Sequence, residues 1–187
     1  MSITQYAYRL RGFLIPIPVI FSLFCFSFET EMDDVIWPLG VSIFLFGIFL
    51  RIWTQQHLHY RLKVKKYLTT TGPYSFIRNP IYLGNILICL GLVVISELLW
   101  FVPISFFYCL GIYFLAVRYE ENHLLKKFGE SYLRYMENVP RWFPVRLNFK
   151  NLGLINDYFY QSIFIEFPCL FLLLPFIIKE VIDKSIH

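Results

Sequence analysis

The residues best suited to chemistry stand where polar segments meet apolar runs. Arg78 and Asn79 directly precede Pro80, and Pro80 opens a run of apolar residues. Proline is tolerated in the first turn of a helix, so we expect a helix to begin at Pro80. A guanidinium, an amide side chain and the free backbone N–H groups of a helix start can together bind a carboxylate or another anion. The alternative is an interfacial loop whose arginine contacts lipid phosphate, and position alone does not separate the two.

Two adjacent carboxylates, Glu120 and Glu121, follow the end of a later apolar run. Charged groups at the edge of a bilayer are costly unless water or a cation accompanies them. Carboxylates suit an ammonium group or ribose hydroxyls as hydrogen-bond partners. The plainer interpretation is a solvated helix end, in which Arg118 marks the cytoplasmic side.

Apolar and aromatic residues recur at three- and four-residue spacing between Leu124 and Tyr135. This spacing is typical of an amphipathic helix. We predict one helix over 124–135 that lies at the membrane interface as a lid, with Trp142 and Phe143 as anchors behind it.

The histidines and cysteines do not form a metal-binding pattern. The cysteines all lie inside apolar runs without CxxC or Cys/His spacing, so we predict neither a metal site nor a disulfide framework. Three histidines stand in or next to polar segments and could serve as a base, although an interfacial histidine is more often only solvated: His57, His59 and His123.

Composition predicts an all-α integral membrane protein. Of the 187 residues, 57% are hydrophobic and 16% are charged, whereas soluble domains have about 25% charged residues. The apolar residues cluster in runs that approach the roughly 20 residues a bilayer span requires. The net charge of +4 comes from basic residues between these runs, where membrane topology places them, so no nucleic-acid partner is expected.

The apolar runs predict about five transmembrane helices, over about 12–28, 35–53, 80–95, 98–117 and 160–178. The third and fourth are separated by little more than Ser96 and Glu97, so they form a helical hairpin. The last run contains Pro168 and Pro175, which leaves a re-entrant segment as an alternative. The loop at 29–34 is acidic and the segment 54–79 is basic, which predicts a cytoplasmic N-terminus. The polar segments 54–79 and 118–158 then share the cytoplasmic side.

These features resemble a known family when they are read in order. The order is Gly-Pro-Tyr at 72–74, Arg-Asn-Pro-x-Tyr-Leu-Gly at 78–84, a hairpin, Glu-Glu at 120–121, Phe-Gly-x-x-Tyr-x-x-Tyr at 128–135 and Val-Pro-Arg-x-x-Pro at 139–144. The set resembles the isoprenylcysteine carboxyl methyltransferase and phospholipid methyltransferase superfamily, particularly its small bacterial members. The resemblance covers about 68–144, and the spans at 12–53 and 160–178 are not diagnostic.

The resemblance implies a single membrane methyltransferase domain over 1–187 that uses S-adenosylmethionine in a cytosolic cofactor pocket. It implies a lipid or lipidated acceptor and a place in the bacterial inner (plasma) membrane. The residues it points to for catalysis are Arg78, Asn79 and Tyr82. Those it points to for the cofactor are Gly72, Pro73, Tyr74, Pro80, Leu83, Gly84, Glu120 and Glu121.

The acceptor stays open between a prenylcysteine-like carboxylate and a phospholipid amine. The isoprenylcysteine branch usually has histidine where this chain has Asn79, which offers only hydrogen bonds. A carboxylate needs only orientation, whereas an amine must first lose a proton to a base. Two other classes also remain, an NADPH-dependent membrane sterol-type reductase and a non-catalytic membrane protein. The sequence leaves the oligomeric state undetermined.

Overall fold

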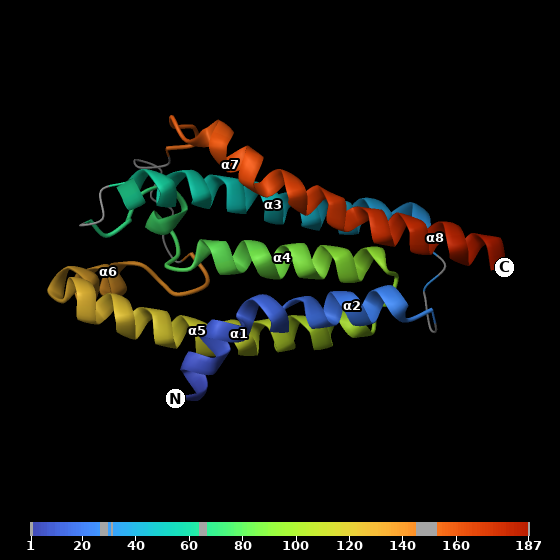
Figure 1. Cartoon of the computed structure of the whole chain (residues 1–187), viewed down its shortest axis with the longest axis horizontal. Coiled ribbons are helices and arrows are strands. Elements are labelled where there is room, and N and C mark those ends of the chain that lie inside the picture. Colours follow the sequence, from blue (N-terminus) through green and yellow to red (C-terminus); the bar gives the residue numbers. More distant parts are fainter. Residues whose placement is uncertain (1, 27–29, 31, 64–66, 145–152, 187) are drawn as a thin grey trace.

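The chain forms long helices that run along a common axis, as the computed structural model in Figure 1 shows. The structure describes residues 2–26, 30, 32–63, 67–144 and 153–186. These residues contain helices and no strand, which confirms the predicted all-α class. Four helical stretches among them are long and apolar enough to cross a membrane: Ile3–Phe24, Asp33–Leu58, Phe101–Phe128 and Phe159–Asp183.

The fifth apolar helix, α4 (Pro80–Ile95), has 16 residues and packs along α3 (Asp33–Lys63). Glycines bring the two backbones into contact. A Cβ built on Gly47 would lie 2.9 Å from the carbonyl oxygen of Gly84, too close for a real side chain. Small residues at such contacts let membrane helices approach closely.

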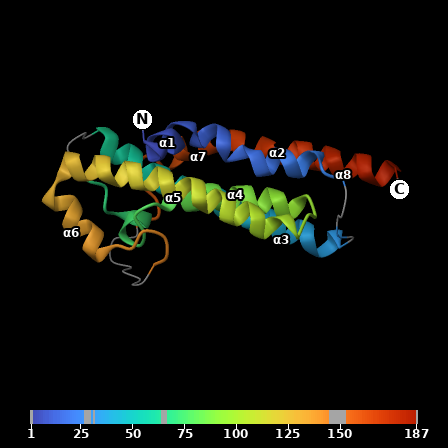
Figure 2. The ribbon, with the colours of Figure 1, turned by 90° about the horizontal axis from the view of Figure 1, so that it is seen from below.

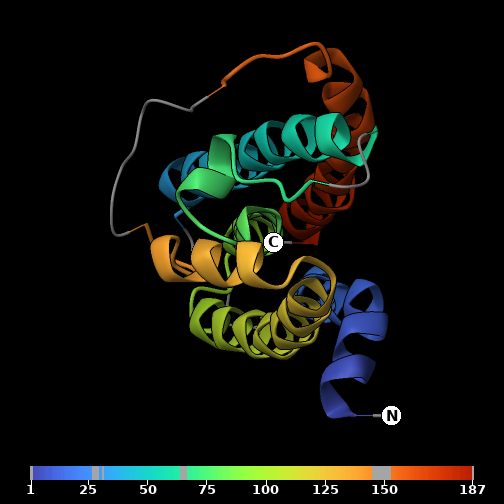
Figure 3. The ribbon, with the colours of Figure 1, turned by 90° about the vertical axis from the view of Figure 1, so that its left-hand side faces the viewer.

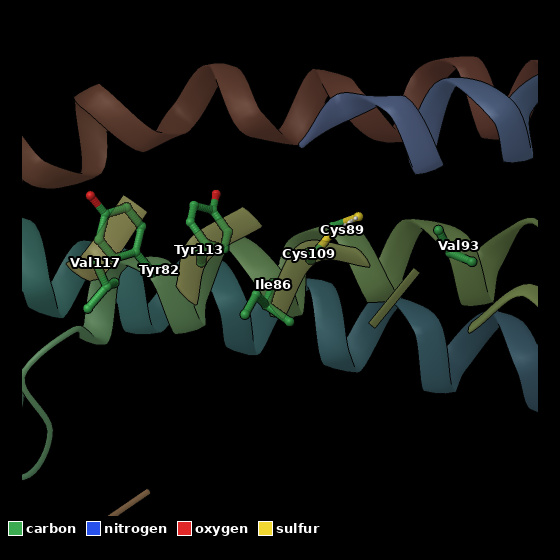
Figure 4. Close-up of a cluster of buried hydrophobic side chains, with 7 residues drawn as sticks. All are labelled: Tyr82, Ile86, Cys89, Val93, Cys109, Tyr113 and Val117. Carbon is green, nitrogen blue, oxygen red and sulfur yellow. Dashed lines mark hydrogen bonds between the residues drawn. The ribbon is translucent and has the colours of Figure 1, made fainter. Parts of the chain in front are cut away.

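Helix α5 (Phe101–Phe128) packs against α4 as the second arm of the predicted hairpin. Buried side chains from both helices form one core cluster, shown in Figure 4: Tyr82, Ile86, Cys89, Val93, Cys109, Tyr113 and Val117. The hydroxyls of Tyr82 and Tyr113 point to the same side of α4 (Figure 4).

The remaining long elements form a second layer on one side of α3, α4 and α5, as Figure 2 shows. They are α1 (Ile3–Leu14), α2 (Pro16–Phe24), α7 (Phe159–Glu166), the 3₁₀ segment η3 (Phe167–Leu173) and α8 (Leu174–Ile186). Seen from one end in Figure 3, α1 and α7 stand apart, with α4 between them.

Prolines cause the break between α1 and α2. Pro18 has no N–H to donate to the carbonyl oxygen of Leu14. The Tyr108 hydroxyl of α5 donates to this oxygen instead, at 3.1 Å.

The described parts of the two predicted polar segments lie at the same end of the molecule. The start of α1, the end of α3, the start of α4, the end of α5 and the start of α7 all lie toward the left of Figure 1. The turn between α4 and α5 and the C-terminus lie at the opposite end. The polar segments 54–79 and 118–158 can therefore build one site together.

Several helices extend beyond the predicted boundaries. The first begins at Ile3 rather than near 12, the second continues from 53 to Lys63, and the fourth continues from 117 to Phe128. Hydropathy marks only the apolar part of a helix, and polar residues can continue it into water. The last apolar run is helical from Phe159 to Ile186, with Pro168 accommodated by η3.

The single helix predicted over 124–135 is wrong. Gly129 has φ +54°, a conformation that L side chains rarely adopt, and it ends α5. A separate helix, α6 (Glu130–Asn138), begins directly after it.

For some residues of the predicted polar segments, either the whole residue or the side chain lies outside what the structure describes. They are Glu29 and Glu31 of the acidic loop, Lys65 and Lys66, and the side chains of His59, Arg61 and Lys63.

Candidate active site

A cavity of about 380 Å³ lies at the end of the bundle where α4 begins and α5 ends. Its walls come from the end of α3, the segment before α4, the start of α4, the end of α5 and α6. Six of the lining residues are aromatic: Tyr67, Tyr74, Tyr82, Phe128, Tyr132 and Tyr135. The polar lining includes Arg78, Asn79, Glu120 and Lys127.

A short 3₁₀ helix, η1 (Gly72–Ser75), forms one wall through Tyr74. Gly72 has φ +61°, and a Cβ at this position would collide with the imidazole of His57. The His57 ring in turn lies 3.1 Å from the Thr71 hydroxyl and 2.8 Å from the Gly153 carbonyl oxygen. His57 therefore supports the loop from behind and does not line the cavity.

The residues before α4 are held by a second chain segment that follows α6. The backbone N–H of Arg78 donates to the Pro140 carbonyl at 2.9 Å. The side-chain amide nitrogen of Asn79 donates to the backbone carbonyl of Arg141 at 3.4 Å. Pro80 then starts α4, as predicted, so the chain crossing fixes where Arg78 and Asn79 stand relative to the cavity.

Glu121 is buried in a network of two arginines. Its carboxylate accepts from Arg141 Nε at 3.1 Å and lies 3.3 Å from Arg78 Nη2. A second contact joins Arg141 Nη2 to the other carboxylate oxygen at 2.5 Å. Glu121 does not line the cavity, so in this structure it fixes Arg78 and Arg141.

Glu120 faces the cavity, unlike its neighbour. It accepts a hydrogen bond from the Tyr82 hydroxyl at 2.5 Å. Consecutive residues of a helix point about 100° apart, which explains why the two glutamates have different partners. The Tyr82–Glu120 pair joins α4 to α5 at the cavity wall.

Helix α6 covers the cavity through Tyr132 and Tyr135. The Tyr135 hydroxyl donates to the Tyr74 carbonyl at 2.7 Å and ties α6 to η1. Burial raises the pKa of the Tyr74, Tyr132 and Tyr135 phenols, and the negative charge of Glu120 adds to this for Tyr74. All three phenols therefore stay protonated at neutral pH and can donate hydrogen bonds.

The remaining predicted residues do not line the cavity. Gly72, Pro73 and Pro80 are buried and shape the backbone around it. Leu83 is half-buried, and Gly84 packs against α3, where a Cβ would lie 2.7 Å from Arg51 Cγ.

Sequence reasoning missed several residues of the site. Arg141 lies within the Val-Pro-Arg-x-x-Pro motif, which was the signal available for it. Leu58 and Lys127 also line the cavity, and nothing in their local sequence marks them. His123 is exposed on α5.

The part of the chain that the structure describes holds no group of three His, Cys, Asp or Glu side chains that could bind a metal ion.

Comparison with known proteins matches residues 35–131 to the sequence profile of the family described as phospholipid methyltransferase. The Delta(14)-sterol reductase LBR of Gallus gallus is 28% identical over 69% of this chain and 23% of its own length. The cobalt-zinc-cadmium resistance protein CzcN of Cupriavidus metallidurans is 30% identical over 67% of this chain and 60% of its own length.

A third relative is the nickel-cobalt-cadmium resistance protein NccN of Alcaligenes xylosoxydans xylosoxydans, 30% identical over 57% of this chain and 47% of its own length. The chain thus spans between 23% and 60% of the length of these relatives. No solved structure matches it.

Proposed function

Because the chain belongs to the phospholipid methyltransferase family, we propose that it transfers a methyl group from S-adenosylmethionine to an acceptor embedded in the bilayer. The observation that carries the proposal is the convergence of Arg78, Asn79, Tyr82 and Glu120 on one cavity next to apolar helices.

The cavity suits this cofactor in size and chemistry. Its volume of about 380 Å³ falls within the roughly 300–1,000 Å³ that small-molecule sites occupy. Arg78 Nε is buried and has no hydrogen-bond partner among the described residues, so it keeps a donor for a carboxylate. Glu120 is a matching acceptor for an ammonium group or a ribose hydroxyl. The aromatic rings suit a sulfonium cation, an attraction worth about 0.5–2 kcal/mol.

When bound, the cofactor would supply an electrophilic methyl group for in-line displacement. The residues of this chain contribute mainly positioning and the exclusion of water. Arg78 is held by Glu121 and by the Pro140 carbonyl, so it can orient an anion without moving. Tyr132 and Tyr135 close the cavity above it.

The acceptor chemistry depends on whether a proton must be removed. A carboxylate acceptor needs only a cation to orient it. An amine acceptor needs a base, and Glu120 is the carboxylate that lines the cavity. Asn79 can orient either acceptor but cannot take up a proton.

We assign the cavity to the cytoplasmic side of a bacterial inner membrane, with the N-terminus on that side. Basic residues near the helix ends support this orientation. The acceptor would enter from the bilayer, because each methylene kept out of water contributes about 0.8 kcal/mol.

The second candidate function is reduction of a lipid double bond with NADPH. The match to a sterol reductase favours it. Glu120 would repel the 2′-phosphate of NADPH, whereas Arg78 and Lys127 could bind it, so cofactor binding has to separate the two functions.

Cofactor binding to the detergent-purified protein tests the proposal. Tritium-labelled S-adenosylmethionine should bind, NADPH should not compete, and Arg78→Ala should abolish binding and methyl transfer. Arg118→Ala is the matched control, because Arg118 is exposed on α5 and does not line the cavity.

Binding of NADPH without binding of S-adenosylmethionine would favour the reductase. Binding of neither cofactor by folded protein would refute both enzyme functions. Methylation of water-soluble and lipid acceptors at equal rates would rule out entry from the bilayer.

A further inference from the structure

Arg11 is a half-buried cation near the end of α1, outside the segment that matches the family. Its guanidinium lies over the Tyr8 ring, 3.9 Å from the ring centroid, and it donates to the Tyr8 carbonyl. No described carboxylate forms an ion pair with it. A charged guanidinium in a membrane-spanning stretch is costly unless a polar partner offsets the cost.

Arg11 stands beside the wall of the cavity. Helix α1 packs along α5, and the Tyr8 ring lies 5.0 Å from the ring of Tyr119, the residue before Glu120. Arg11 is also close enough to the Tyr82 hydroxyl to act on it electrostatically. This hydroxyl donates to Glu120, and both residues line the cavity.

Three other half-buried arginines around this region have carboxylate partners. Arg51 lies 2.8 Å from Glu166 and also donates to Asn85. Arg78 and Arg141 share Glu121, as described above. Arg11 differs from them because, among the described residues, its partners are the Tyr8 carbonyl and the Tyr8 ring rather than a carboxylate.

We propose that Arg11 binds the anionic group of the lipid acceptor, a phosphate or carboxylate oxygen, and so places its headgroup against Tyr82. The proposal rests on the proposed function and names the chemistry by which the acceptor is recognised. A guanidinium offers two parallel N–H donors to such oxygens, a geometry that a lysine cannot reproduce.

The position of α1 fits this role. Helix α1 belongs to a stretch that can cross the membrane, so a headgroup held by Arg11 keeps its tail in lipid. In Figure 3, α1 and α7 stand apart with α4 between them. The anion is then held next to Tyr82, which also lines the cofactor cavity.

Binding of tritium-labelled dodecyl phosphate to the purified protein tests the site without requiring catalysis. The comparison is between wild type, Arg11→Gln and Arg9→Gln, because Arg9 is an exposed arginine on the same helix. Loss of a charge-assisted contact should weaken binding about tenfold or more in Arg11→Gln. Arg9→Gln should bind as wild type, since general attraction of the anion to the basic helix affects both variants equally.

Two competitors identify the ligand. Dodecanoate should displace the label from wild type, whereas inorganic phosphate should not, because the site takes an anion carried by an apolar tail. Displacement by inorganic phosphate at equal concentration, or equal affinity in Arg11→Gln and Arg9→Gln, overturns the proposal. If Arg11→Gln does not fold, Arg11→Lys compared with Arg9→Lys gives the same decision: weaker binding in the first supports the site, and equal binding overturns it.

S-adenosylmethionine binding is measured on the same samples. Normal cofactor binding with no effect of Arg11 on dodecyl phosphate refutes the acceptor site alone. Arg11-dependent dodecyl phosphate binding without cofactor binding refutes the proposed methyl transfer.

Discussion

The adjacent glutamates should separate stability from cofactor binding when each is replaced by glutamine. Glu121 has a side chain only 6% exposed and faces two guanidiniums, of Arg78 and Arg141. Glu121→Gln keeps the shape but removes the charge, leaving both arginines without their carboxylate. Removal of one partner from a buried ion pair costs about 3–5 kcal/mol.

The resulting loss should be visible as a fall in Tm. For a chain of this size, each kcal/mol corresponds to roughly 2–4 °C, so Glu121→Gln should lower Tm by roughly 6–20 °C. Glu120→Gln should change Tm little, because the glutamine can still accept from the Tyr82 hydroxyl. It should instead weaken S-adenosylmethionine binding about tenfold or more, through loss of a charge-assisted contact.

Thermal unfolding of the detergent-purified variants, followed by a thiol-reactive dye or intrinsic fluorescence, measures the first effect. Equilibrium binding of labelled cofactor below the lowest Tm measures the second. A Glu121→Gln protein with wild-type Tm and impaired cofactor binding would refute the structural role given to Glu121. A Glu120→Gln protein with a lowered Tm and normal cofactor binding would refute the binding role given to Glu120 and indicate a structural one.

Gly72→Ala should weaken cofactor binding and lower Tm, because the new Cβ meets a buried imidazole at a left-handed backbone position; Gly111→Ala, whose Cβ meets nothing, should do neither. Single cysteines at Met32 and Lys126, introduced into a cysteine-free chain, should be labelled from opposite sides of the membrane, and labelling from one side would contradict the topology. Burial raises the pKa of the Tyr135 phenol, so the folded protein holds this proton more tightly than the unfolded chain. Stability should therefore be full below the ordinary phenol pKa of about 10 and fall as the pH rises above it. Tyr135→Phe should reduce that alkaline slope in denaturation curves, and an unchanged slope would mean that Tyr135 does not contribute.

The sequence predicted the membrane class and the order of the apolar helices because hydropathy alone determines which segments enter a bilayer. It misplaced the helix ends because helix formation continues where hydropathy stops. The segment from Thr54 to Lys63 is mostly polar yet helical, so His57 stands on α3 behind Gly72 rather than in a loop. The break at Gly129 also needed the backbone conformation, since helical periodicity continues across it.

For the site, short motifs identified several residues that line one cavity: Tyr74, Arg78, Asn79, Tyr82 and Glu120. Motifs could not decide which of two adjacent glutamates faces that cavity, because this depends on the rotation of α5 against α4. They also gave no reason to pair Glu121 with Arg141. This contact forms because the chain turns back toward α4 after the helix breaks between α5 and α6, and a motif does not predict that turn.

The glycine contacts between α3 and α4 restrict where the molecule can widen. Besides the Gly47–Gly84 contact, a Cβ on Gly40 would lie 2.9 Å from the Gly91 carbonyl oxygen. The two helices thus touch through backbone at two levels, and neither can accept a larger side chain there or separate without losing both contacts. A bulkier acceptor would then have to displace elements other than α3 and α4, such as α5 or α6, while the start of α4 keeps its place.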